Sequence, residues 1–225
     1  MTKFAVKQKT VFLSFALMSL ILLTGCDKET ESSDKIVELI KGSKPLKAAE
    51  KDGSIKTITL YEAMKTHEEH EHASNPSEHH HKHNKLKHFC LGITTGFKAI
   101  QFANANFSPD SYPANGKLYI KVNGAMDGVW DMFSIYAGDK REFSGKDKPM
   151  NLSSFTFNAK YEDSEEQLEF RLKEGIIPDK FFELKNQGFG CGNKELGKAK
   201  NKALIKILSS PAQECFELVS KSKSQ

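Results

Sequence analysis

The chain of 225 residues has only four cysteines, and no two of them form a Cys-x-x-Cys pair. A structural zinc ribbon and a thioredoxin-like redox site are therefore unsupported. Gly-x-Ser-x-Gly and His-Glu-x-x-His are missing too, which removes the signatures of the α/β-hydrolases and the zincins. The glycine-rich stretches "GITTG" and "GFGCG" lack a following Lys-Ser/Thr, so they are not phosphate loops.

Long apolar runs are equally scarce, apart from one near the start of the chain. Three lysines precede the 13-residue run "VFLSFALMSLILL", which is too short for a permanent transmembrane helix and has the layout of a secretory signal. The run ends in "LTGC", which resembles the bacterial lipobox. The resemblance implies that residues 1–25 are a removed signal peptide and that Cys26 is acylated. We therefore expect a protein of the bacterial cell envelope, lipid-anchored to a membrane and facing the periplasm.

The chain without that signal also has little net charge of either sign. The full chain has 33 basic and 29 acidic residues, and the first 25 residues hold three of the basic ones, which leaves a net charge of +1. A nearly neutral chain has no general field that attracts nucleic acid, so we expect no nucleic-acid partner. The eight histidines are the adjustable charge, because they become cations below about pH 6.

The pattern along the chain predicts a single α+β domain in which a small antiparallel sheet packs against helices. Residues 26–56 are polar and predict a tether, whereas 57–87 predict a short helix at 60–66, with Thr59 as its N-cap, followed by a histidine-rich loop. The domain at 88–222 then begins with an amphipathic helix that places lysine and asparagine opposite its apolar side. Further along, alternation predicts a strand at 117–124 and a hairpin at 153–175, and helical spacing predicts helices at 126–138, at 178 onward, at 194–208 and after Pro211.

Histidine is the residue that is present in unusual density. All eight histidines fall within 22 positions of the 225-residue chain, and imidazole suits zinc, nickel and copper. The segment could therefore gather ions, and the alternative is a solvated loop whose histidines have no specific task. The candidate ligands in this histidine-rich segment (residues 67–88) are His67, His70, His72, His79, His80, His81, His83 and His88.

The stretch "KHFCLGITTGFKAI" resembles the E-type family of formylmethanofuran dehydrogenase domains, whose motif looks like His-Gly-His-x-Cys-Pro-Gly followed by a Gly-x-x-Ala helix. The matching positions are His88, Cys90, Gly92, Gly96 and Ala99. The resemblance extends over roughly residues 57–220 and implies the family's α+β fold and a bound metal. It does not imply formylmethanofuran chemistry, because stand-alone members of the family look like metal-binding domains. Leu86, Lys87 and Leu91 stand where the motif has His, Gly and Pro, which argues against an inherited redox or catalytic role.

Three cysteines remain in the mature chain after Cys26 is set aside. Cys90 precedes a helix whose N-terminus favours a thiolate, and with His88 two positions away we favour a metal ligand over a buried apolar thiol. Cys191 is either a third ligand or a disulfide partner of Cys90. Cys215 follows a helix start and is expected in the core.

These observations predict a lipid-anchored metal-binding protein, with zinc as the expected cofactor and nickel or copper as rivals. It would capture, buffer or hand over the ion, with a metal transporter as a possible recipient. The alternative is a thiol-dependent or redox enzyme in which Cys90 reacts, His88 is the base and Cys191 resolves. A third interpretation is an interaction protein whose histidines sense acid.

Overall fold

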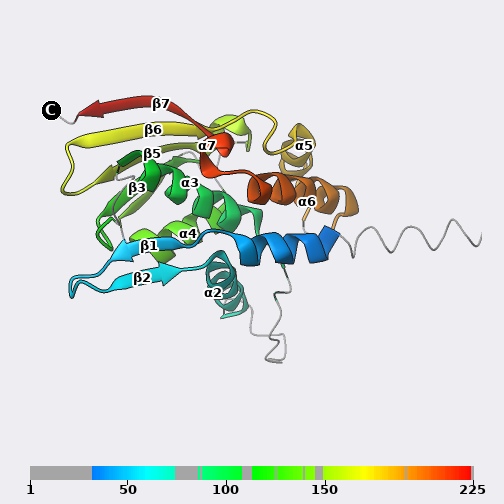
Figure 1. The fold of residues 1–225 in the computed structure, drawn as a ribbon. Coiled ribbons are helices and arrows are strands. Elements are labelled where there is room, and N and C mark those ends of the chain that lie inside the picture. Colours follow the sequence, from blue (N-terminus) through cyan, green and yellow to red (C-terminus); the bar gives the residue numbers. More distant parts are fainter. Residues whose placement is uncertain are drawn as a thin grey trace, which may run out of the picture.

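The computed structural model describes residues 32–73, 86, 88–107, 113–124, 126–138, 140–144, 149–190 and 192–223. The fold is α+β, as predicted (Figure 1). After a helix at residues 32–42, the elements are β1 (Leu46–Ala49), β2 (Ile55–Ile58), α2 (Leu60–Ala73), α3 (Leu91–Phe107), β3 (Leu118–Asn123), α4 (Asp127–Ala137), β4 (Arg141–Ser144), η1 (Leu152–Phe155), β5 (Thr156–Tyr161), β6 (Glu166–Leu172), α5 (Asp179–Asn186), α6 (Lys194–Ser209), α7 (Ala212–Cys215) and β7 (Phe216–Lys223).

The larger sheet has five strands in the order β4-β3-β5-β6-β7. All neighbouring strands are antiparallel except β3 and β4, so the sheet is mixed and not purely antiparallel. Its inner face is built by alternation, as in β6, where Leu168, Phe170 and Leu172 are fully buried. The helices cover this inner face (Figure 1), and Phe102 of α3 packs against Phe170 with ring centroids 4.9 Å apart.

Helix α3 lies at the centre of the molecule and is buried on all sides. Twelve of its 17 residues are buried, including Lys98, Thr94 and Thr95. The predicted solvated side is therefore wrong. The Lys98 ammonium donates to the carbonyl of Ser210, with 2.7 Å between Nζ and the oxygen, which gives one of its three N–H donors a partner inside the protein.

Residues 32–56 are folded, so the predicted tether at 26–56 is wrong for this part of the chain. Ile36 and Ile40 of the first helix and Leu46 of β1 are at most 2% exposed and belong to the hydrophobic core. Strands β1 and β2 form an antiparallel hairpin on the side of α3 and α4 that faces away from the five-stranded sheet (Figure 1). The core thus begins well before residue 57.

Helix α2 starts as predicted, but it is longer than the expected span of 60–66. The Thr59 hydroxyl accepts a hydrogen bond from the N–H of Glu62 at 3.1 Å, and the Glu62 carboxylate accepts one from the N–H of Thr59 at 3.0 Å. This capping box fixes the first turn, and it lowers the pKa of Glu62 because both the N–H and the hydroxyl of Thr59 favour the charged carboxylate. Within the parts of the chain that the structure describes, no helix is long and apolar enough to span a membrane.

Candidate functional site

Cys90 lies directly before the first residue of α3 and is a free, half-buried thiol. Its carbonyl accepts hydrogen bonds from the N–H and the hydroxyl of Thr94. Its sulfur occupies the space in which Gly128 of α4 lacks a side chain: a Cβ built on Gly128 would lie 2.5 Å from Sγ. The thiol therefore borders two helix N-termini, that of α3 and that of α4.

The close approach of α3 and α4 depends on their glycines. A Cβ on Gly92 would lie 2.9 Å from both the Cα of Gly128 and the backbone nitrogen of Val129. One turn later, a Cβ on Gly96 would lie 2.9 Å from the Cβ of Met132. Only residues without side chains allow the two backbones to come this near, and the same packing presses the Cys90 sulfur against α4.

The two ends of the histidine-rich segment meet beside Cys90. The Glu68 carboxylate on α2 accepts a hydrogen bond from the backbone N–H of His88, with 2.8 Å between the nitrogen and the oxygen. These residues are 20 positions apart, and His88 is exposed. Glu68 and the chain at His88 are therefore joined at one place, two residues from the thiol.

His67 differs from the loop ligand that the sequence predicted, because it belongs to α2 and is only 5% exposed. Its Nδ1 lies 2.6 Å from a carboxylate oxygen of Asp131 on α4. A carboxylate on Nδ1 fixes the orientation of the ring, an arrangement that also supports metal-binding and catalytic histidines. Asp131 was missed by the sequence analysis, although His67 continues the buried helical spacing of Leu60, Ala63 and Met64.

The remaining predicted residues divide into three groups. Cys215 is fully buried, as predicted, and burial raises the pKa of its thiol. Cys90 is a free thiol in the structure. Outside the described residues lie Cys26, Cys191, His79, His80, His81 and His83, together with the side chains of His70 and His72.

A complete metal site is not formed by the described residues alone. Among them, no group of three or more His, Cys, Asp or Glu side chains could hold a metal ion. His88 and Cys90 provide an imidazole and a thiol two positions apart. Both are ligand types that zinc prefers, but a zinc site needs three or four protein ligands. Any further donors must come from outside these residues.

Comparison with known proteins finds no matching family model and no similar curated protein. The resemblance to the E-type family of formylmethanofuran dehydrogenase domains therefore stays a prediction.

Proposed function

We propose that the protein is a lipid-anchored protein of the bacterial envelope that binds a transition metal ion, zinc first, for capture, buffering or hand-over to a transporter. Cys26 would carry the acyl chains. His88 and Cys90 would supply two ligands at the surface of the folded domain. The histidines between His70 and His83 would complete the coordination, with Cys191 as a further candidate.

The observation that carries this proposal is the hydrogen bond of 2.8 Å between Glu68 and His88, which closes the segment next to Cys90. A chain extends by at most about 3.5 Å per residue. His83, five positions before His88, therefore lies within about 18 Å of it, and His70 lies similarly close to Glu68. This closure supports the proposal because it keeps both ends of the segment next to the thiol.

His67 has a different part in this proposal. Because it is buried and bonded to Asp131, it stabilises the contact between α2 and α4 at the base of the segment. Removing it would damage the fold, so an experiment on the metal ligands should leave it in place.

We expect the untagged mature chain to bind at least one zinc ion, and replacing six histidines by glutamine to weaken that binding at least tenfold. The six are His70, His72, His79, His80, His81 and His83, and their loss removes most of the nitrogen donors. Isothermal titration with zinc, together with elemental analysis, measures both affinity and stoichiometry.

The matched control replaces Lys82 and Lys85 in the same segment by glutamine. Protonated lysines are not ligands, so zinc binding should stay unchanged in this variant. Sub-stoichiometric zinc in the unmodified chain, or equal affinity in the six-histidine variant, would contradict the proposal.

One observation favours the alternative of a thiol enzyme: Cys90 is a free thiol at the start of a long helix. Against it, the sulfur is packed on Gly128 and is only half accessible. We therefore expect iodoacetamide to alkylate Cys90 no faster than an ordinary exposed cysteine. Peptide-level mass spectrometry over time measures the rate. Alkylation many times faster than that of glutathione would support the enzyme instead.

A further inference from the structure

Helix α6 has an exposed row of lysines on the side that faces away from the core. Lys194, Lys198, Lys202 and Lys206 recur every four residues and are all exposed. Residues spaced by four lie on one side of a helix. The opposite side is buried and consists of Leu196, Ala199, Ala203, Leu204, Ile207 and Leu208.

The positive charge of the mature chain is concentrated on this helix. With Lys200, α6 has five lysines and only one acid, Glu195, which gives it a net charge of +4. Since the chain after residue 25 has a net charge of +1, all other residues together have a net charge of −3. The helix at 32–42 and α5 add no net charge beside the row, because each has two lysines and two acidic residues.

Two lysines of the row have contacts at the protein surface. Lys198 pairs with Glu195 at 2.9 Å, and both side chains are more than half exposed. Lys206 donates to the carbonyl of Gly175 at 2.8 Å. An exposed pair of this kind contributes little to stability, so it does not prevent the lysine row from meeting another anionic surface.

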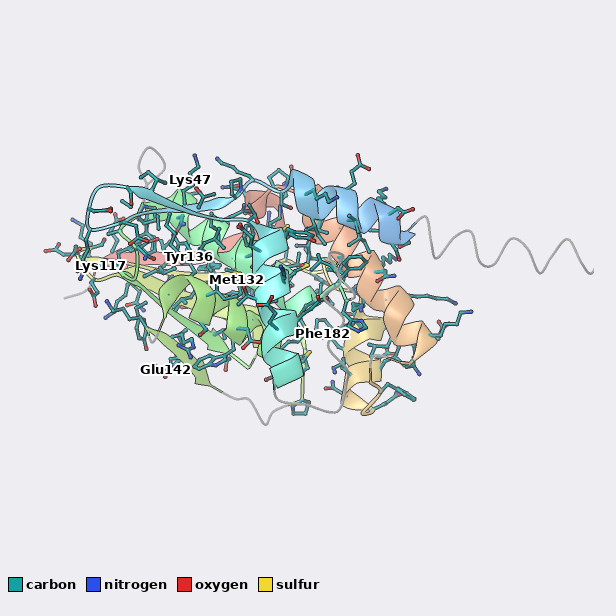
Figure 2. The ribbon with its side chains drawn as sticks, turned by 90° about the horizontal axis from the view of Figure 1, so that it is seen from below. Lys47, Lys117, Met132, Tyr136, Glu142 and Phe182 are labelled. Carbon is teal, nitrogen blue, oxygen red and sulfur yellow. The ribbon has the colours of Figure 1, made fainter. Side chains whose placement is uncertain are left out.

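The start of the described chain lies at the same end of the molecule as α5 and the beginning of α6. Figure 1 and Figure 2, which differ by a quarter turn, both place the first residues of the helix at 32–42 there. Residue 32 is six positions after Cys26. Six residues span at most about 20 Å, so an anchor at Cys26 keeps this end of the domain close to the membrane.

We propose that the lysine row of α6 binds the headgroups of anionic phospholipids beside the anchor and holds the domain with α6 against the membrane. The inference rests on the lipid anchor of the proposed function. The acyl chains supply the attachment, whereas the lysines supply the orientation. A lysine near an anionic lipid surface strengthens binding about fivefold, so several in a row give a stable contact.

The test uses the mature chain with Cys26→Ser, so that membrane binding reports on the protein surface without acyl chains. We expect this chain to sediment with phosphatidylglycerol-rich vesicles and not with phosphatidylcholine vesicles. Replacing Lys194, Lys198 and Lys202 by glutamine should weaken the binding roughly 100-fold. Raising the salt concentration should weaken it as well, because screening shortens the range of the attraction.

The matched control removes the same charge elsewhere, through glutamine at the exposed residues Lys51, Lys56 and Lys223. Equal weakening by both triple variants, or no binding to the anionic vesicles, would overturn the proposal. The anchor is tested separately by the mass of the acylated N-terminal peptide of the unmodified protein. A missing acyl group would refute the anchor. Vesicle binding of the Cys26→Ser chain would still test whether the lysine row binds anionic lipid.

Discussion

Replacing Gly92 by alanine is expected to lower the free energy of unfolding by about 2 kcal/mol or more. The new Cβ would lie 2.9 Å from the Cα of Gly128 and 2.9 Å from the nitrogen of Val129. Both are backbone atoms of α4, so no side chain can rotate away and the helices must separate. This loss exceeds the gain of about 1 kcal/mol that alanine gives over glycine inside a helix.

Gly197 in α6 is the matched control, because a Cβ at that position would meet nothing within 4 Å. Gly197→Ala should therefore stabilise the protein by about 0.5–1 kcal/mol. Urea denaturation of the two variants gives opposite shifts of the midpoint with unchanged slope. A midpoint for Gly92→Ala at or above that of the unmodified chain would refute the tight contact between α3 and α4.

This contact gives the glycines of the sequence motif a physical role. Gly92 and Gly96 allow α3 to pack closely on α4. Cys90 is placed by the same packing, since its sulfur fills the space above Gly128. The position of the Cys90 thiol and the packing at Gly92 therefore depend on the same helix pair.

The elements that could be predicted are those in which one side faces the core and the other faces water. Strand β3 alternates between buried Leu118, Ile120 and Val122 and half-buried or exposed neighbours, and the β5–β6 hairpin does the same. Helix α4 buries Val129, Met132 and Tyr136, as its spacing predicts. In these elements local periodicity and tertiary burial agree.

The elements that were missed lack such periodicity. Strand β7 is an edge strand in which only Phe216 is buried, so its sequence shows no alternation. Strands β1 and β2 have four residues each, too few for a pattern. Helix α3 has a periodic pattern, but the pattern predicted a solvated side that does not exist. Lys98 is buried and donates a hydrogen bond to the carbonyl of Ser210.

The sequence predicts which residue types make up the candidate site, but not the long-range contacts that position them. The density of histidines and the neighbours His88 and Cys90 can be read directly in the chain. The pair His67–Asp131 joins residues 64 positions apart, and the bond between Glu68 and His88 closes a loop of 20. Contacts of this kind depend on how α2 and α4 pack, which no local pattern encodes.

Above pH 10 the protein is expected to lose stability steeply, because burial disfavours the ionisation of two tyrosines in the folded state. Tyr136 and Tyr161 are 4% and 8% exposed, and burial raises the pKa of both hydroxyls. Tyr161 donates to the Asn104 carbonyl oxygen at 2.5 Å, Asn104 donates to Tyr136 at 2.9 Å, and Tyr136 donates to the carbonyl of Lys47 at 3.4 Å.

The direction follows from the protons that each state binds. The unfolded chain releases both tyrosine protons above about pH 10, whereas the folded chain keeps them, so the stabilisation is complete below pH 10 and is lost as the pH rises. Each tyrosine lowers the free energy of unfolding by at most about 1.4 kcal/mol per pH unit, over the range in which it is ionised in the unfolded chain only. Cys215 acts in the same direction because its pKa is raised, and Lys98 acts in the opposite direction because burial lowers its pKa.

Tyr161→Phe separates this effect from general alkaline damage. The variant loses its hydrogen bond to Asn104 and should be about 1 kcal/mol less stable than the unmodified chain at pH 8. With one tyrosine fewer to ionise on unfolding, its stability should fall about 1.4 kcal/mol less per pH unit above pH 10, so the two curves cross near pH 11. Urea titrations from pH 8 to 11.5, with tyrosinate absorbance as a second signal, measure the crossing. Parallel curves would mean that Tyr161 ionises equally in both states and that the buried network does not exist.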